Sequence, residues 1–401
     1  MAFPHAAIDI ARAPVGSARP TALYRAAASY GAAPFWTAIN GWAARDIYGD
    51  PDTEITALQS GVGVCDFGIF ARYRIDGPDA AELLQRLTTA PAGRLSVGQS
   101  APGLLCDRHG FLVDLARVTR LRTETFALVC ARSAPLRLKF AARGLNATYK
   151  DISEDAAAIA VFGPLAGALL IAADLGGGAE PSFAALVDEA AGASSADHAP
   201  TLISSARQLT AGGVDVTISP ISVGAMKGVE LVFAASEGLV MWERLFRRYP
   251  QAQPVGLRAL ELARLEGREP RVGADFISAD APDAAGSKRT PFDVGLAALA
   301  PIDSAWFNGR AALRTLEGSA RKLTMVACAS DAVRPGAAVR RNGAVVGRVT
   351  SCAYSPRQRE TIAFVDSAEG PLDQEGAALA LTIATDLRHA GGRSEADARP
   401  Y

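Results

Sequence analysis

The sequence changes character near residue 320, and this change constrains the fold more than any other feature of the chain. Before it, short apolar segments with the period of helices alternate with segments that have the period of strands. After it, KLTMVAC, AAVRRNGAVVGRVTS, ETIAFVD and AALALTI all have the pattern of strands, and Asn342 followed by Gly343 indicates a tight hairpin. The pattern predicts that a β-rich domain follows a region of mixed helices and strands. The 401 residues are too many for one simple core, so we expect two or three domains.

The mixed region contains patterns that predict individual elements. Residues 51–62 have the composition of a helix with an acidic start, and residues 256–267 have the leucine spacing of a second helix. The segment ARYRIDGP alternates arginines with apolar residues before a Gly-Pro turn, which predicts a strand that leads into a helix. Residues 101–119 predict a hairpin with His109 and Gly110 at its turn.

Other segments lack these patterns. Residues 1–30 are rich in Ala, Pro and Arg, which is typical of a loosely held arm, and the last dozen residues are polar and predict a frayed tail. Residues 176–200 predict a flexible surface segment, and residues 277–289 a polar loop. The Gly-Gly-Gly run at 176–178 lacks the lysine and the preceding strand that a phosphate-binding loop requires.

Composition excludes several classes of partner. Lys and Arg number 41 against 42 Asp and Glu, so the net charge is −1 and the basic excess needed to bind nucleic acid is missing. The sequence has no apolar run of about 18 residues and no secretory signal pattern, so we expect no membrane association and a cytoplasmic location. The five cysteines are widely spaced and the histidines number four, so we predict neither a disulfide framework nor a metal site.

Several segments resemble, in order, the motifs of one known family. VGVCDFGIFARYRIDGPDA is similar to a block Val-Gly-x-Phe-Asp-Val-Ser-His-x-Gly that ends in Gly-Pro, and LLCDRHGFLVDLARV is similar to a hairpin Leu-x-Asn-x-x-Gly-Gly-x-x-Asp-Asp-Leu. GAMKGVELVF resembles the end of Tyr-Thr-Gly-Glu-x-Gly-Phe-Glu, and GLRALELARLEG resembles the helix that follows it. With GADF, TPFDVGL, WFNGRAAL and VGRVTSCAYSP, these blocks cover roughly residues 35–380. The chain therefore resembles the aminomethyltransferase superfamily, to which the glycine-cleavage T-protein belongs.

The resemblance implies an α+β fold of three domains, arranged as a cloverleaf around a central channel that binds tetrahydrofolate as cofactor. The first two domains would be interleaved in sequence, and the β-rich third domain agrees with the pattern after residue 320. The expected boundaries are 1–69 with 155–255, 70–154 with 256–305, 306–390 for the β-rich domain, and 391–401 for the tail.

Two carboxylates are the main candidates for the site. Asp114 matches the second Asp of the family hairpin, and the resemblance implies that it stands beside the pterin nitrogens and steers protons. Glu230 matches the last residue of the Gly-Phe-Glu motif, where a carboxylate would accept hydrogen bonds from the pterin amino group and ring N–H. The alternatives are a solvent-exposed Asp at a strand end and a solvated Glu on an edge strand. An unpaired carboxylate in the apolar GVELVF strand would be costly.

Four further residues are weaker candidates. Phe67 and Phe292 can pack on the pterin ring or belong to the core. Arg264 can reach a folate carboxylate or pair with a glutamate of its own helix. His109 can protonate a leaving group, because imidazole titrates near neutrality, or lie in solvent at a turn.

The departures from the family motifs suggest which member this is. Positions that carry polar groups in the family hold Ile69, Ala101, Val113, Val223 and Leu260, with Cys106 or Cys130 at Asn positions. An apolar donor pocket predicts a tetrahydrofolate-dependent demethylase that moves a methyl group from a small O-, N- or S-methylated compound, without a carrier protein. The alternatives are an aminomethyltransferase of glycine cleavage and a non-catalytic folate-binding regulatory protein.

Overall fold

The computed structural model describes residues 17–30, 35–176, 204–282, 287–303, 306–316, 322–330, 333–368, 372, 381–385 and 394–400. The chain forms two compact units: residues 1–103 with 115–260, and residues 104–114 with 261–401. Helices and sheets occur together in the first unit and strands dominate the end of the second, so the predicted α+β class is confirmed. The predicted surface segment 176–200 lies outside the described residues after Gly176.

The central sheet of the first unit has six strands in the order β12-β13-β14-β10-β4-β15. Its middle strand β10, with the sequence AAAIAVF, is buried along its whole length because both faces of the sheet are covered. The strands are β4 (Gly63–Asp66), β10 (Ala156–Phe162), β12 (Arg207–Ala211), β13 (Val214–Val223), β14 (Met226–Ala234) and β15 (Gln253–Pro254).

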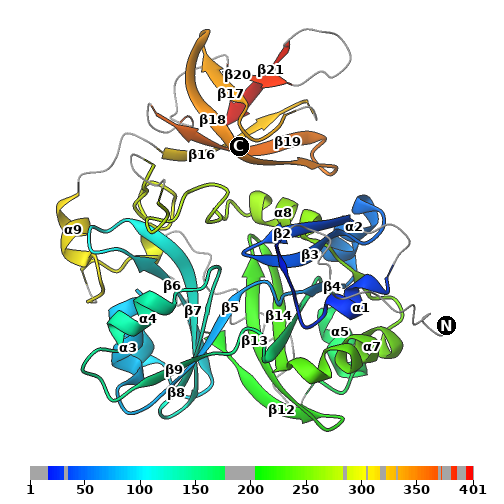
Figure 1. Ribbon diagram of the computed structural model, residues 1–401. Coiled ribbons are helices and arrows are strands. Elements are labelled where there is room, and N and C mark those ends of the chain that lie inside the picture. Colours follow the sequence, from blue (N-terminus) through cyan, green and yellow to red (C-terminus); the bar gives the residue numbers. More distant parts are fainter. Residues whose placement is uncertain are drawn as a thin grey trace. The chain divides into compact units, whose positions relative to one another are not determined.

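The two faces of this sheet have different partners because side chains alternate along each strand. On one face, Ile159 and Leu231 pack in a cluster with Trp242 and other apolar residues of the helices α5 (Ala166–Ala172) and α7 (Gly238–Arg248), which cover that face in Figure 1. The opposite face carries Ala160 and Phe162, which pack with other apolar residues in a second cluster. Glu230 pairs with Ala160 in the β14–β10 register, so it belongs to this second face.

A second sheet has the order β11-β6-β7-β8-β5-β9. The predicted strand before the Gly-Pro turn is β5, and the predicted helix after it is α3, which buries its apolar stripe against β8 and α4. The predicted hairpin is also confirmed, since β6 and β7 flank a turn in which Gly110 has a φ of 82°. The elements are β5 (Ala71–Asp76), α3 (Ala80–Leu87), β6 (Gln99–Cys106), β7 (Leu112–Arg122), β8 (Thr125–Cys130), α4 (Pro135–Ala141), β9 (Thr148–Asp151) and β11 (Ser204–Ser205).

Part of the N-terminal arm is ordered, so its prediction as a loose segment is wrong for residues 19–28. Residues Arg19–Pro20 form β1, which pairs with β3 (Trp42–Ile47) in a three-stranded sheet with β2 (Phe35–Ile39). The short helix α1 (Tyr24–Ala28) follows, and Leu23 is fully buried in the core just before it. A few apolar side chains in an Ala-rich segment were enough to anchor it. The predicted helix at 51–62 is α2 (Pro51–Ser60), with Asp50 as its N-cap.

The β-rich end of the chain is a closed barrel in the order β16-β19-β18-β17-β20-β21. The predicted hairpin turn is confirmed, with φ of 51° at Asn342 and 83° at Gly343. The tail prediction is wrong for Ser394–Pro400, which form β21 between β16 and β20. Closing a barrel uses backbone hydrogen bonds that polar side chains do not prevent. The strands are β16 (Lys322–Cys328), β17 (Ala338–Arg341), β18 (Ala344–Ser355), β19 (Glu360–Ser367), β20 (Leu381–Thr385) and β21.

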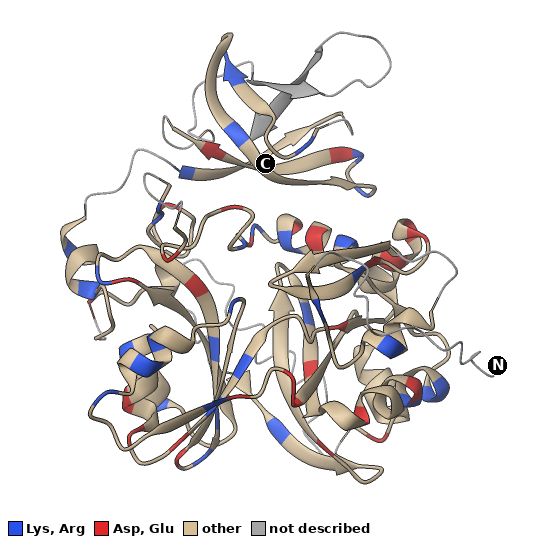
Figure 2. Ribbon diagram, viewed as in Figure 1, with Lys and Arg blue, Asp and Glu red and all other residues tan. Residues whose placement is uncertain are grey.

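The rest of the second unit is mainly loops, with helix α9 (Arg310–Thr315) and most of α8 (Leu257–Glu266). The helix predicted at 256–267 is therefore confirmed. Lys and Arg are interspersed with Asp and Glu along the described elements (Figure 2), as a net charge of −1 suggests. Within the described part of the chain, no helix is long and apolar enough to cross a membrane. The three-domain cloverleaf and its channel stay predictions.

Candidate functional site

The site is built around Glu230, at the centre of the second face of the first sheet. Its register neighbours are Ser219 on β13 and Ala160 on β10, and Ala160 in turn pairs with Cys65 on β4. A row of small side chains therefore flanks the carboxylate. Glu230 is 1% exposed and β14 lies inside the sheet, so the edge-strand alternative is wrong.

Two arginines from the second sheet bind this carboxylate. Arg72 on β5 and Arg117 on β7 both pair with Val129 on the intervening strand β8. Residues in register on adjacent strands point to the same face, so the two guanidinium groups are presented together. Arg72 Nη2 lies 2.5 Å from Glu230 Oε1, and Arg117 Nη2 donates to Oε2. The buried carboxylate thus joins the two sheets of the first unit.

The charges of this cluster explain how a carboxylate is tolerated inside an apolar strand. Burial opposes ionisation of Glu230, but the positive charges and hydrogen bonds of Arg117 and Arg72 outweigh it and lower its pKa. Glu230 is therefore ionised at neutral pH. Neither arginine was among the residues predicted for the site. The cost of an unpaired Glu230 was the signal that a cation had to be near.

Phe67 lies in the same neighbourhood as Glu230. Arg72 donates from Nη2 to the Phe67 carbonyl oxygen at 2.9 Å and from Nη1 to the Phe70 carbonyl oxygen at 3.1 Å. The Phe67 ring is 4.8 Å from that of Phe70 and 6.2 Å from that of Phe162, centroid to centroid. Arg72 therefore connects Phe67 with Glu230. The rings of Phe67, Phe70 and Phe162 form an apolar wall on the same face of the sheet.

Asp66 is a second buried carboxylate near this cluster. Its Oδ2 accepts a hydrogen bond from the Thr21 hydroxyl, and its Oδ1 accepts one from the Gly68 N–H at 2.9 Å. Burial raises its pKa to about 6, although these hydrogen bonds and the charge of Arg72 act in the opposite direction. Asp66 lies in the segment VGVCDFGIFARYRIDGPDA, at the Asp of the first family block.

The positions where the chain departs from the family motifs are buried in apolar surroundings. Ile69, at the family His, is 2% exposed and packs with Trp42 and Ala44. Leu260, at the first helix Arg, is 6% exposed and joins the cluster of Phe67 and Phe162. The other replacements that are fully or largely buried are Ala101, Cys106, Val113, Cys130 and Val223.

Asp114 lies on β7 and is 3% exposed, so the solvent-exposed alternative for this residue is wrong. Its assignment as the carboxylate beside the pterin stays a prediction. His109 has a side-chain exposure of 57% and sits in the turn between β6 and β7. Its Nε2 accepts a hydrogen bond from Arg108 Nε, and its Nδ1 is 3.7 Å from Asp107 Oδ2. His109 is therefore in the environment of the second alternative given for it, a histidine in solvent at a turn.

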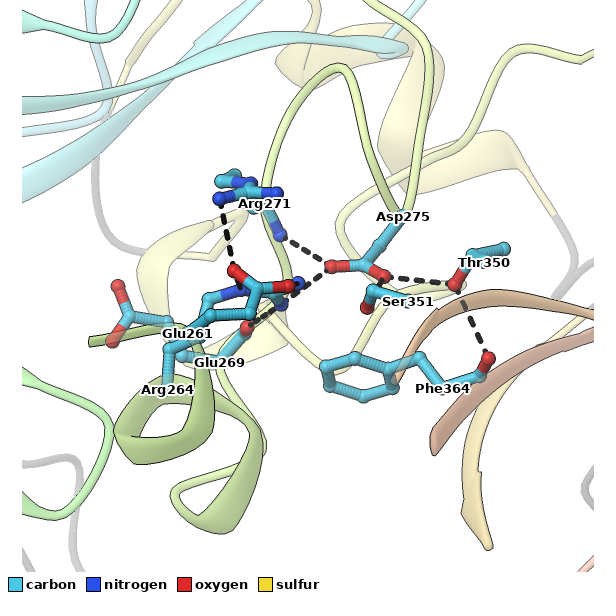
Figure 3. Close-up of polar contacts among 8 residues, drawn as sticks. All are labelled: Glu261, Arg264, Glu269, Arg271, Asp275, Thr350, Ser351 and Phe364. Atoms are coloured by element: carbon cyan, nitrogen blue, oxygen red, sulfur yellow. Dashed lines mark hydrogen bonds and ion pairs between the residues drawn. The ribbon is translucent and has the colours of Figure 1, made fainter. Parts of the chain in front are cut away.

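Arg264 belongs to a structural network within the second unit (Figure 3). Its guanidinium donates to both carboxylate oxygens of Glu261, to the Glu269 carbonyl oxygen at 2.9 Å and to Asp275 Oδ2 at 2.7 Å. Asp275 also accepts hydrogen bonds from Thr350 and Ser351 of the barrel strand β18. Arg264 therefore ties its helix to the barrel, which supports the structural alternative over contact with folate.

Phe292 is half-buried in a loop of the second unit, where its carbonyl oxygen accepts a hydrogen bond from Lys322 Nζ at 3.2 Å. Its place against a pterin ring stays a prediction. Among the described residues, no group of three His, Cys, Asp or Glu side chains is arranged to hold a metal ion.

The surroundings of Glu230 fit the pterin of tetrahydrofolate under one condition. A carboxylate has about four lone-pair positions, and the two arginines occupy one on each oxygen. Both oxygens can therefore accept a further donor, and the in-register neighbours of Glu230, Ser219 and Ala160, are small. Glu230 is 1% exposed, so a pterin can reach it only if the side chain that now covers the carboxylate moves away. That movement is the condition.

The family described as GCVT N-terminal domain matches residues 21–290, and the Glycine cleavage T-protein C-terminal barrel domain matches residues 321–390. An aminomethyltransferase of Saccharopolyspora erythraea is 26% identical over 398 residues, which are 96% of this chain and 99% of the relative. A probable aminomethyltransferase of Haloarcula marismortui is 29% identical over 356 residues, covering 84% of this chain and 89% of the relative.

A solved structure shares the fold. The glycine cleavage system aminomethyltransferase T from Bartonella henselae superposes with a TM-score of 0.75 at 23% sequence identity, covering 96% of this chain and 97% of that one. The superposition agrees with the α+β class and with the β-rich C-terminal barrel found here.

Proposed function

The chain belongs to the glycine cleavage T-protein family, and from this premise we propose that it transfers a one-carbon unit to tetrahydrofolate. The observation that carries the proposal is Glu230, a buried, ionised carboxylate with unused acceptor positions on a face lined by small and aromatic residues. Such a group suits the donor edge of a reduced pterin. Tetrahydrofolate supplies a nucleophilic nitrogen as the one-carbon acceptor.

The residues of the chain would contribute positioning more than covalent chemistry. Glu230 fixes the orientation of the pterin edge, and the aromatic wall of Phe67, Phe70 and Phe162 excludes water on that side. Arg72 holds the carboxylate in place through its bonds to two backbone carbonyl oxygens. Asp114, buried on β7, is our candidate for the group that holds or moves a proton at the reacting nitrogen.

The comparisons favour an aminomethyl group as the unit transferred, because the relatives reported above are named aminomethyltransferases. On this proposal the donor is an aminomethyl group on a carrier, and ammonia is released. A second candidate, the demethylase predicted from the sequence, is favoured by one observation. Positions that carry polar groups in the family, such as Ile69 and Leu260, are buried in apolar clusters here, which suits a methyl compound better than a polar aminomethyl arm.

Product analysis separates these candidates. Purified protein is incubated with tetrahydrofolate and either an aminomethylated lipoyl carrier or a panel of O-, N- and S-methyl compounds, and the folate products are identified by mass spectrometry. Release of ammonia with formation of 5,10-methylenetetrahydrofolate supports the aminomethyltransferase. Formation of 5-methyltetrahydrofolate from a methyl compound supports the demethylase. Binding of tetrahydrofolate without either product would leave the non-catalytic folate-binding protein.

A further inference from the structure

The two arginines on Glu230 are held in very different ways. Arg72 is 3% exposed in its side chain and donates to two backbone carbonyl oxygens as well as to Glu230. Arg117 is 19% exposed, and Glu230 is the hydrogen-bond partner that the described residues give it. The Nε atoms of both arginines are buried without a partner among the described residues, so the difference between them lies in the bonds of their terminal nitrogens. Arg72 is therefore fixed in the fold, whereas a single ion pair holds the Arg117 side chain.

The guanidinium of Arg117 has the same chemistry as the ligand expected at Glu230. A guanidinium is planar and presents N–H donors to a carboxylate in a forked arrangement. The 2-amino group and the adjacent ring N–H of a pterin form a planar pair of donors of the same kind. Glu230 is thus covered by a group of its own chain that resembles the recognised edge of tetrahydrofolate.

We propose that Arg117 is a displaceable occupant of the pterin position and sets the affinity of the protein for tetrahydrofolate. The inference rests on the proposed function and deepens it. The donor edge of the pterin replaces the Arg117 guanidinium on Glu230 Oε2, and Arg117 moves toward the solvent that already reaches part of its side chain. Arg72 stays in place and keeps Glu230 ionised during the exchange.

Competition of this kind lowers apparent affinity in a predictable way. Only the fraction of molecules in which Arg117 has left Glu230 can bind, so the measured Kd equals the intrinsic Kd divided by that fraction. If Arg117 covers the carboxylate in about 90–99% of molecules, its removal tightens binding by about ten- to a hundredfold. A merely structural role would have the opposite sign, because loss of a structural contact weakens the site.

The test is titration calorimetry of the full chain with tetrahydrofolate. Arg117→Met keeps the length of the side chain and removes its donors, and Arg117→Lys keeps the charge but removes the planar fork. The matched control is Arg74→Met, since Arg74 lies on the same strand as Arg72 but pairs with Asp76 at the surface. We expect a Kd about ten- to a hundredfold lower for Arg117→Met, a smaller decrease for Arg117→Lys, and no change for Arg74→Met.

Each outcome decides the inference. Tighter binding by Arg117→Met than by the wild type supports it. Measurable binding by Arg117→Met also supports it if the wild type binds too weakly to measure. If the wild type binds tetrahydrofolate and Arg117→Met binds it equally well or more weakly, the inference is overturned and the proposed function stands. Absence of binding by every variant overturns the proposed function itself. If circular dichroism shows that Arg117→Met is misfolded, Arg117→Lys decides: tighter binding supports the inference, and unchanged or weaker binding overturns it.

Discussion

Glu230→Gln removes one negative charge from the interior and leaves two guanidinium groups without their counter-ion. The side chain keeps its size, so the effect is electrostatic rather than one of packing. Removing one partner of a buried ion pair costs about 3–5 kcal/mol. Arg117 has a side-chain exposure of 19% and regains some hydration, so we expect the lower end, about 3 kcal/mol. The first unit has about 250 residues, for which each kcal/mol shifts the melting temperature by about 2–4 °C, giving a decrease of about 6–12 °C.

Thermal unfolding followed by circular dichroism at pH 7 measures this decrease. The control is the triple variant Arg72→Met, Arg117→Met, Glu230→Leu, which replaces the whole cluster by apolar side chains and should recover most of the loss. A melting temperature for Glu230→Gln within about 2 °C of the wild type, less than 1 kcal/mol on this scale, would refute the view that both arginines depend on this carboxylate inside the fold.

The remaining predictions concern individual side chains. The folded-state pKa of Asp66 is about 6 against 3.8 unfolded, so its ionisation destabilises the fold progressively as pH rises from about 4 to 6. Asp66→Asn should therefore become more stable than the wild type across that window, and at pH values above 7 its free energy of unfolding should be larger by about 3 kcal/mol. Chemical denaturation at a series of pH values tests this, and a difference in free energy of unfolding that does not change with pH would contradict it. Arg264→Met should lower the melting temperature without changing the Kd for tetrahydrofolate, and a weaker Kd in calorimetry would restore the folate-contact hypothesis. Asp114→Asn should remove turnover while keeping the Kd for tetrahydrofolate within several-fold of the wild type, whereas His109→Gln should keep both turnover and Kd. Equal turnover of Asp114→Asn and the wild type in steady-state assays would exclude a catalytic role for Asp114.

Local structure was predictable where a pattern has one physical cause. The turn at Asn342 and Gly343 requires positive φ at both residues, and the sequence offers two residues that adopt it readily. The helix α2 begins at an Asp followed by Pro, and both signals are local. β21 was missed because its polar sequence SEADARP is held by backbone pairing with β20 and with the distant strand β16, and backbone pairing leaves no mark on the side-chain pattern.

The candidate site was predictable only where its signal lay in the local sequence. Glu230 was found because a carboxylate in an apolar strand is costly and matched a family motif. Its partners were missed because Arg72 and Arg117 reach it only through the register of three strands of another sheet. Arg264 illustrates the converse: its helix suggested a glutamate such as Glu261 as a partner, but Asp275 follows in a loop and is fixed by barrel residues far along the chain.

The most direct test of the central claim is calorimetric titration of tetrahydrofolate into the wild type and into Glu230→Gln, at a temperature where circular dichroism shows both to be folded. If the buried carboxylate holds the pterin, the wild type binds and the variant does not. Equal affinities for the two proteins would contradict the account, because the folate would then be recognised elsewhere on the chain.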